Sequence, residues 1–276
     1  MKIGFGDNQF LGVSQSVGRG AEYFNRYADP QEIAATLKEA WSVGLRDFAF
    51  TVSDRTIAAL DIVGDECPFN LHPALPYAQR INQLVLDEGL VGAITTKARR
   101  FGISKLVRAG VGAMFGKNRL GLSLLIRSEL AGIDMARVRS VGLLNVATDF
   151  AAGSDRYDLL LDFCDIVEQD FGLTPCLYTM NFPAVAEVLW GRESRQCSLI
   201  FNLNSAGFRV NPSLNAVLDT VDKYSAHEAI AMSLFSGGAA DGVLTILQQA
   251  PGLSGVLFGS SNPVNIRANY EMLKDR

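Results

Sequence analysis

The chain has 276 residues, of which 48% are hydrophobic and 20% are charged, and its formal net charge is −4. This is the composition of a globular protein, and the acidic balance argues against the basic surface of a nucleic-acid-binding protein. The amino-terminal MKIGFGDNQFLG lacks the apolar core of a signal peptide. No apolar run reaches the roughly 18 residues that cross a membrane. We therefore expect a cytoplasmic protein with no transmembrane segment.

Short apolar runs alternate with longer stretches of helical periodicity, a pattern typical of parallel strands joined by helices. The length is near the roughly 250 residues of a (β/α)8 barrel, and no GxGxxG follows the first run, which disfavours an open dinucleotide-binding sheet. We therefore predict an α/β fold, a (β/α)8 TIM barrel forming one domain over residues 1–276. The expected strands are 3–5, 47–52, 71–75, 138–144, 175–179, 198–203, 229–234 and 255–258.

Helix starts are marked by capping residues and prolines. Asp29 and Pro30 predict a helix start, Ser154 or Asp155 is expected to cap a helix that runs to about Phe171, and another helix follows Pro183. Two more helices are expected to open at Ser213 and at Asn262 or Pro263, and another at 78–88.

Residues 89–135 predict an extended helical insert between the third and fourth strands. From 89 to 128 this segment carries several lysines and arginines but no acid. A basic lid that attracts an anionic substrate, a membrane-surface or oligomer contact, and a solvated helix face all fit this pattern.

Metal and thiol chemistry have little support. The four cysteines, Cys67, Cys164, Cys176 and Cys197, are far apart, and neither CxxC nor HExxH occurs. We expect free buried thiols and no metal, although an Asp/Asn site for Mg²⁺ stays open.

Several motifs resemble those of the aldo-keto reductases. Residues 178–182 (YTMNF) resemble G-V-S-N-F, 199–203 resemble V-P-Y-N-L, and 231–235 (AMSLF) resemble A-Y-S-P-L. Residues 259–269 resemble G-x-x-x-P-x-x-x-x-x-N, and 44–51 resemble G-I-x-x-F-D-T-A. The resemblance skips 89–128. It implies a (β/α)8 barrel that could hold the phosphates of NAD(P) at the corner after strands seven and eight.

The residues that serve proton delivery in that family are replaced here. Its aspartate aligns with Ala49, its tyrosine falls near Asp54, its lysine falls in 73–76, and its histidine aligns with Asn145. Met232 stands where a nicotinamide-stacking tyrosine is expected, and Asn265 stands near a position where an arginine often favours NADP. These departures argue against the family's usual reductase chemistry.

The strand ends supply the candidate site, because a barrel of this class carries its site at the carboxyl ends of its strands. Asp7 and Asp54 could face one cavity and divide the roles of general acid and base, while the amides could hold substrate oxygens. Helix capping and loop bracing are the alternative roles. The candidate catalytic residues are Asp7, Asp54, Tyr77 and Asn145, and the candidate substrate-binding residues are Asn8, Arg55, Tyr178, Asn181 and Asn202.

The turns after strands seven and eight could bind phosphate through backbone N–H groups, hydroxyls and a helix amino terminus. A tight turn beside a capped helix is the alternative. The residues concerned are Ser233, the glycines Gly237 and Gly238 that follow Ser236, then Ser260, Ser261, Asn265 and Asn269.

Three functions fit these residues. We expect first a non-redox lyase, dehydratase or isomerase that uses aspartate acid/base chemistry on a small anionic metabolite. The alternative is an NAD(P)-dependent oxidoreductase related to aldo-keto reductases with an altered site, and a third possibility is a catalytically silent binding barrel. A homodimer is compatible with each of them.

Overall fold

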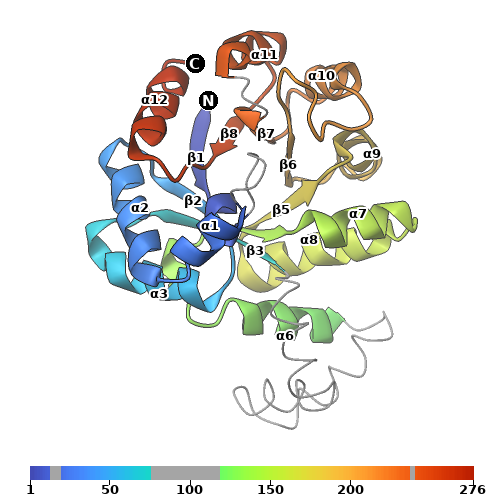
Figure 1. Ribbon diagram of the computed structural model, residues 1–276. Coiled ribbons are helices and arrows are strands. Elements are labelled where there is room, and N and C mark those ends of the chain that lie inside the picture. The colour runs from blue at the N-terminus through green and yellow to red at the C-terminus, as the bar shows by residue number, and fades with distance from the viewer. Residues whose placement is uncertain (13–19, 76–118, 237–239) are drawn as a thin grey trace.

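A computed structural model describes residues 1–12, 20–75, 119–236 and 240–276. Eight parallel strands form a closed barrel in sequence order, with β1 also paired to β8 (Figure 1). The predicted barrel is confirmed, and each predicted strand overlaps an observed one. The strands are β1 Lys2–Gly6, β2 Asp47–Thr51, β3 Asn70–Leu75, β4 Ser140–Leu143, β5 Thr174–Thr179, β6 Ser198–Asn202, β7 Ala229–Met232 and β8 Gly255–Phe258.

Helices surround the barrel, and α1 lies over one end of it (Figure 1). Most of the predicted insert lies outside the described residues, and α6 is its described helical part. The predicted helix at 78–88 also lies outside them. The helices are α1 Gly20–Arg26, α2 Pro30–Ser42, α3 Asp54–Val63, α6 Arg119–Glu129, α7 Asn145–Gly153, α8 Tyr157–Phe171, α9 Phe182–Ala186, α10 Leu214–Lys223, α11 Val243–Gln249 and α12 Pro263–Leu273.

Three of the expected helix caps form as the sequence indicates. The side chains of Asp29, Ser213 and Asn262 accept hydrogen bonds from the first turns of α2, α10 and α12. The cap expected at Ser154 or Asp155 is wrong, because α8 begins at Tyr157 after an uncapped Arg156. Residue 154 instead ends α7, a helix that the sequence analysis did not predict.

Small residues on β1 make room inside the barrel. A Cβ atom added at Gly4 would lie 3.1 Å from Leu257 Cδ1, and one added at Gly6 would lie 3.4 Å from Leu257 Cγ. Leu257 of β8 therefore fills the space that side chains on β1 would otherwise take, as expected for the packed interior of such a barrel.

The amino-terminal ends of the strands carry a polar cluster. His72 hydrogen-bonds to Ser140 Oγ through Nδ1 at 2.7 Å and to Asp47 Oδ1 through Nε2 at 3.0 Å. Partial burial alone would raise the pKa of Asp47, but the hydrogen bond and charge of His72 hold that pKa below its usual value. This cluster ties β2, β3 and β4 together at the end of the barrel opposite the site expected from the sequence.

The two chain ends lie close together (Figure 1). The amino group of Met1 donates a hydrogen bond to the carbonyl of Arg276 at 3.2 Å. Within the described part of the chain, no helix is long and apolar enough to span a membrane.

Candidate functional site

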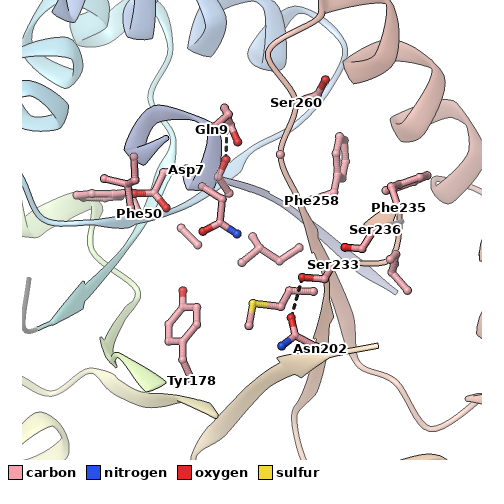
Figure 2. Close-up of a pocket in the computed structure, with 18 of the residues that line it drawn as sticks. Asp7, Gln9, Phe50, Tyr178, Asn202, Ser233, Phe235, Ser236, Phe258 and Ser260 are labelled. Carbon is pink, nitrogen blue, oxygen red and sulfur yellow. Dashed lines mark hydrogen bonds between the residues drawn. The ribbon is translucent and has the colours of Figure 1, made fainter. Parts of the chain in front are cut away.

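A cavity of about 620 Å³ opens at the carboxyl ends of the strands (Figure 2). Its volume is within the range of sites for small molecules and cofactors. Every strand or the residue directly after it contributes to the wall; these residues are Gly6, Ala49, Ala74, Leu144, Tyr178, Asn202, Met232 and Leu257. The described residues of the barrel therefore enclose a hollow with a mixed polar and apolar lining at the end where the sequence predicted a site.

Asp7 brings a buried carboxyl group to this wall. It directly follows β1, is 7% exposed, and accepts a 2.6 Å hydrogen bond at Oδ2 from the backbone N–H of Thr51. Burial raises the pKa of the Asp7 carboxyl to about 7, and the hydrogen bonds from Thr51 and the charge of Arg55 offset that rise only in part. Asp7 can therefore exist in both protonation states near neutral pH.

Tyr178 of β5 points its hydroxyl into the same cavity (Figure 2). Burial raises its pKa well above the usual value, and the nearby charge of Asp7 adds to that rise. Tyr178 is therefore a neutral hydrogen-bond donor at physiological pH. Its ring fits against Gly142 of β4, where an added Cβ atom would lie 2.9 Å from Tyr178 Cε2.

Asn202 and Ser233 form the wall on β6 and after β7 (Figure 2). The hydroxyl of Ser233 donates to Asn202 Oδ1 at 2.7 Å, and Asn202 Nδ2 donates to the carbonyl of Arg209 at 3.2 Å. Ser233 has a φ of +65°, a left-handed conformation that is uncommon for a residue other than glycine. This turn thus holds both side chains in a defined orientation.

Two serine hydroxyls at the β7 and β8 ends have no hydrogen-bond partner among the described residues. Ser236 Oγ and Ser261 Oγ are both buried, and both residues line the cavity. Buried hydroxyls without a partner are rare in native proteins because leaving them unpaired costs free energy. Two such donors in one cavity, with Ser261 just before the amino terminus of α12, suit an acceptor-rich anionic ligand.

Arg209, in the segment between β6 and α10, adds a cation to the wall. Its guanidinium lies 5.2 Å from the centre of the Phe208 ring. Among the described wall residues, Arg209 and Asp7 are the only two that carry an ionisable group other than tyrosine. In the described part of the chain, no group of three or more His, Cys, Asp or Glu side chains is placed to hold a metal ion.

The comparison with solved structures identifies the barrel type. Two structures of Pseudomonas aeruginosa proteins assigned to the aldo-keto reductases match 99% of this chain and 89% of their own, with a TM-score of 0.56 and 12% sequence identity. The fold is that of an aldo-keto reductase. No protein-family model and no curated protein sequence matches the chain.

This aldo-keto reductase-like barrel overturns the first functional expectation. A lyase, dehydratase or isomerase was predicted, and the neighbours of this fold are instead assigned as reductases. The finding favours the alternative, an oxidoreductase with an altered site.

Many of the predicted site residues meet in the cavity of the aldo-keto reductase-like barrel. Those that line it are Asp7, Asn8, Asn145, Tyr178, Asn202, Ser233, Ser260, Ser261, Asn265 and Asn269. Tyr77, Gly237 and Gly238 lie outside the described residues.

Three predicted residues do not line the cavity, and the expected Asp7–Asp54 pair is wrong. Ser53 caps α3, so Asp54 is an exposed residue in the first turn of that helix. Arg55 reaches the carbonyl of Tyr27 at 3.5 Å, and Asn181 is exposed at the start of α9.

The wall also contains residues that were not among the predicted site residues, including Arg209, Thr51 and Ser236. Arg209 has no motif around it, and it reaches the wall because Asn202 and Asn204 fold its loop back onto β6. Thr51 was not predicted, because only its place at the end of a strand distinguishes it in the sequence. Ser236 was predicted only as part of a turn. A polar residue followed by two glycines after a strand could have drawn attention to Ser236.

Proposed function

We propose that this chain is an NAD(P)H-dependent oxidoreductase of the aldo-keto reductase type with an altered proton-donating group. One observation carries the proposal: Ser236 Oγ after β7 and Ser261 Oγ, just before α12, are buried without partners among the described residues, and both residues line the cavity. Two donors that lack an internal acceptor fit a ligand with phosphate oxygens.

The residues present fit such a cofactor in chemical type. Ser236 and Ser261 would hold its phosphates, and Asn265 and Asn269 on α12 line the adjacent wall. Both asparagines are neutral and offer no positive charge to a 2′-phosphate, so we expect tighter binding of NADH than of NADPH. When bound, a nicotinamide supplies a hydride for a carbonyl carbon. The chain's own task is to orient the substrate, exclude water and move a proton.

Titration of the purified protein with NADH and NADPH, followed by fluorescence and calorimetry, tests this proposal. We expect micromolar binding of NADH. The double substitution Ser236→Ala/Ser261→Ala should weaken binding about tenfold or more, since two hydrogen bonds to a charged group are lost. Ser42→Ala at the exposed end of α2 is the matched control and should leave binding unchanged. No binding of either nucleotide at millimolar concentration would contradict the proposal.

The substrate is proposed to be a small anionic carbonyl compound. Arg209 supports this, because it is the one cation among the described wall residues and a guanidinium can pair with a carboxylate in two-point geometry. Arg209→Leu should raise the KM for keto acids at least tenfold while changing the KM for neutral aldehydes less than twofold. An equal change in KM for keto acids and for neutral aldehydes would contradict the proposed preference for anionic substrates.

A cytoplasmic location and a homodimer stay predictions. Cell fractionation tests the first, and light scattering of the purified protein tests the second.

A further inference from the structure

Asp7 occupies a position in the cavity that no other described carboxyl group shares. It is the only acidic residue among the described residues of the wall, it is 7% exposed, and it follows β1 at the mouth of the barrel. Figure 2 shows its side chain in the cavity together with the Tyr178 hydroxyl. A buried carboxyl placed next to bound substrate is suited to exchange a proton with it.

Residues on several strands and helices influence the pKa of the Asp7 carboxyl group. Thr51 of β2 donates both its backbone N–H, at 2.6 Å to Oδ2, and its side-chain hydroxyl. The cation of Arg55 on α3 acts on Asp7 through space, although its side chain is directed to the Tyr27 carbonyl. Tyr178 from β5 also lies near enough for the charge of Asp7 to affect its pKa.

The remaining ionisable groups of the wall are Tyr23 of α1 and Arg209. No lysine or histidine is among the described wall residues, so no second group of near-neutral pKa competes with Asp7 there. The carboxyl group is thus available both as an acid and as a base in the pH range where burial has brought its pKa.

We propose that Asp7 is the catalytic proton donor and acceptor for the substrate oxygen, in a barrel whose sequence lacks the usual tyrosine for that task. This role rests on the proposed function. In the reduction direction, a bound nicotinamide would supply the hydride for the carbonyl carbon, and the electron pair of the C=O π bond would move to the substrate oxygen. The O–H bond of Asp7 breaks as the new O–H bond of the alcohol forms, and the electron pair of the broken bond stays on the carboxylate.

The resulting carboxylate keeps its two hydrogen bonds from Thr51, which favour the charged form. A proton from water restores the acid before the next cycle. Tyr178 can donate a hydrogen bond to the same substrate oxygen and orient it, because its hydroxyl stays neutral.

The first experiment compares wild-type protein with Asp7→Asn. Asparagine keeps the shape and can still accept the Thr51 N–H bond but cannot deliver a proton. We expect kcat for reduction to fall at least 100-fold, the usual contribution of a positioned acid, with NADH affinity within twofold of wild type. Asp61→Asn, an exposed aspartate on α3, is the matched control and should keep wild-type turnover.

The pH profile separates a proton donor from a merely structural residue. In wild type, kcat for reduction should fall above about pH 7, as Asp7 loses its proton. Thr51→Val removes the hydrogen bond from the Thr51 hydroxyl that stabilises the Asp7 carboxylate, so the pH at which kcat begins to fall should increase. If the kcat profile of Thr51→Val falls at the same pH as that of wild type, Asp7 does not have the proposed role.

A direct titration gives a readout that does not depend on turnover. Carbon-13 NMR of protein labelled at aspartate carboxyls should show one resonance that titrates near pH 7, absent from Asp7→Asn and present in Asp61→Asn. If wild type binds NADH but Asp7→Asn retains full turnover, or if no aspartate titrates near neutral pH, the proton-donor role is wrong while the proposed function stands. If wild type binds neither nucleotide, the proposed function fails.

Discussion

Asp7 shows at the scale of one residue how a buried ionisable group lowers stability once it is charged. A carboxyl group free in the unfolded chain titrates near 3.8, whereas in the fold its pKa is raised by burial to about 7. A raised pKa means that the native state holds the proton more tightly, so its favourable contribution is complete below pH 3.8 and is lost as the pH rises to 7. Above that pH, the fold contains a buried charge.

Removing that charge should stabilise the protein at alkaline pH. Asp7→Asn should raise the free energy of unfolding at pH 8.5 by up to roughly 4 kcal/mol, the equivalent of about three pH units, and by far less at pH 4. Urea denaturation at the two pH values measures the difference. An equal effect at both would show that the Asp7 carboxyl is not titrating as its burial requires.

Asp47, at the opposite end of the barrel, responds to pH in the other direction. Its pKa is held below the usual value by His72, so its contribution is present above pH 3.8 and is lost as the pH falls through its folded-state pKa. Its side chain is 37% exposed, so solvent screens this contribution and keeps it small. The two carboxyl groups together favour a stability maximum on the acidic side of neutrality.

At the scale of elements, a glycine on one strand makes room for a cavity-lining side chain on the next strand. Gly142 of β4 leaves room for the Tyr178 ring of β5, since a Cβ atom there would lie 2.9 Å from the ring and 3.3 Å from Ala74 Cα. The crowding comes from the ring on one side and from the backbone of β3 on the other. The orientation of Tyr178 thus depends on three adjacent strands.

Gly142→Ala tests this packing. The added methyl group should displace the Tyr178 ring and lower the free energy of unfolding by about 1–3 kcal/mol, as overpacking in a core does. Gly153→Ala at the end of α7 is the matched control, because nothing lies within 4 Å of its added Cβ atom. Thermal denaturation and the fluorescence of bound NADH report the two effects. A Gly142→Ala protein as stable as the control would show that the ring moves freely.

The contrast between α7 and the strands shows what sequence patterns can predict. Strand residues are buried on both faces, so their apolar runs are visible in the sequence, and the strands overlap the predicted ranges. In α7 the large apolar residues Val146 and Phe150 are 68% and 72% exposed, while the buried positions are Thr148 and Ala151, so large apolar residues do not mark the buried face of the helix.

The sequence predicted which residues follow the strands and therefore which end of the barrel they occupy. It did not predict which of them face the cavity. Asp7 and Asp54 both follow strands, but the sequence does not show that Ser53 caps α3 and leaves Asp54 in solvent. The pKa of Asp7 depends on burial by neighbours distant in sequence. Arg209 reaches the wall through a loop held by asparagine side chains, and no local pattern indicates that contact.

At the scale of the whole molecule, the closed barrel brings the two ends of the chain together. The Met1 amino group bonds to the Arg276 carbonyl, and β1 completes the barrel against β8. A short linker can therefore join Met1 to Arg276 without crossing the cavity mouth, which lies at the carboxyl ends of the strands.

A circular permutant tests this arrangement. With Met1 and Arg276 joined by a short Gly/Ser linker and new ends opened between Asp65 and Glu66, in the exposed 3-10 segment after α3, the protein should fold and keep its NADH affinity within about threefold, because exposed connections tolerate such cuts. Opening the chain between Phe48 and Ala49, inside β2, is the matched control and should abolish folding. Circular dichroism and nucleotide titration compare the two. A permutant at 65/66 that cannot fold would show that the order of synthesis matters.

The near-neutral carboxyl group of Asp7 also makes ligand binding and proton uptake one event. A ligand that closes the cavity removes more water from Asp7, and an anion placed beside it repels its charge, so either effect draws a proton from the buffer. By reciprocity, acidification strengthens the binding of that ligand. We therefore expect the occupancy of the cavity to be linked to pH through the carboxyl group of Asp7.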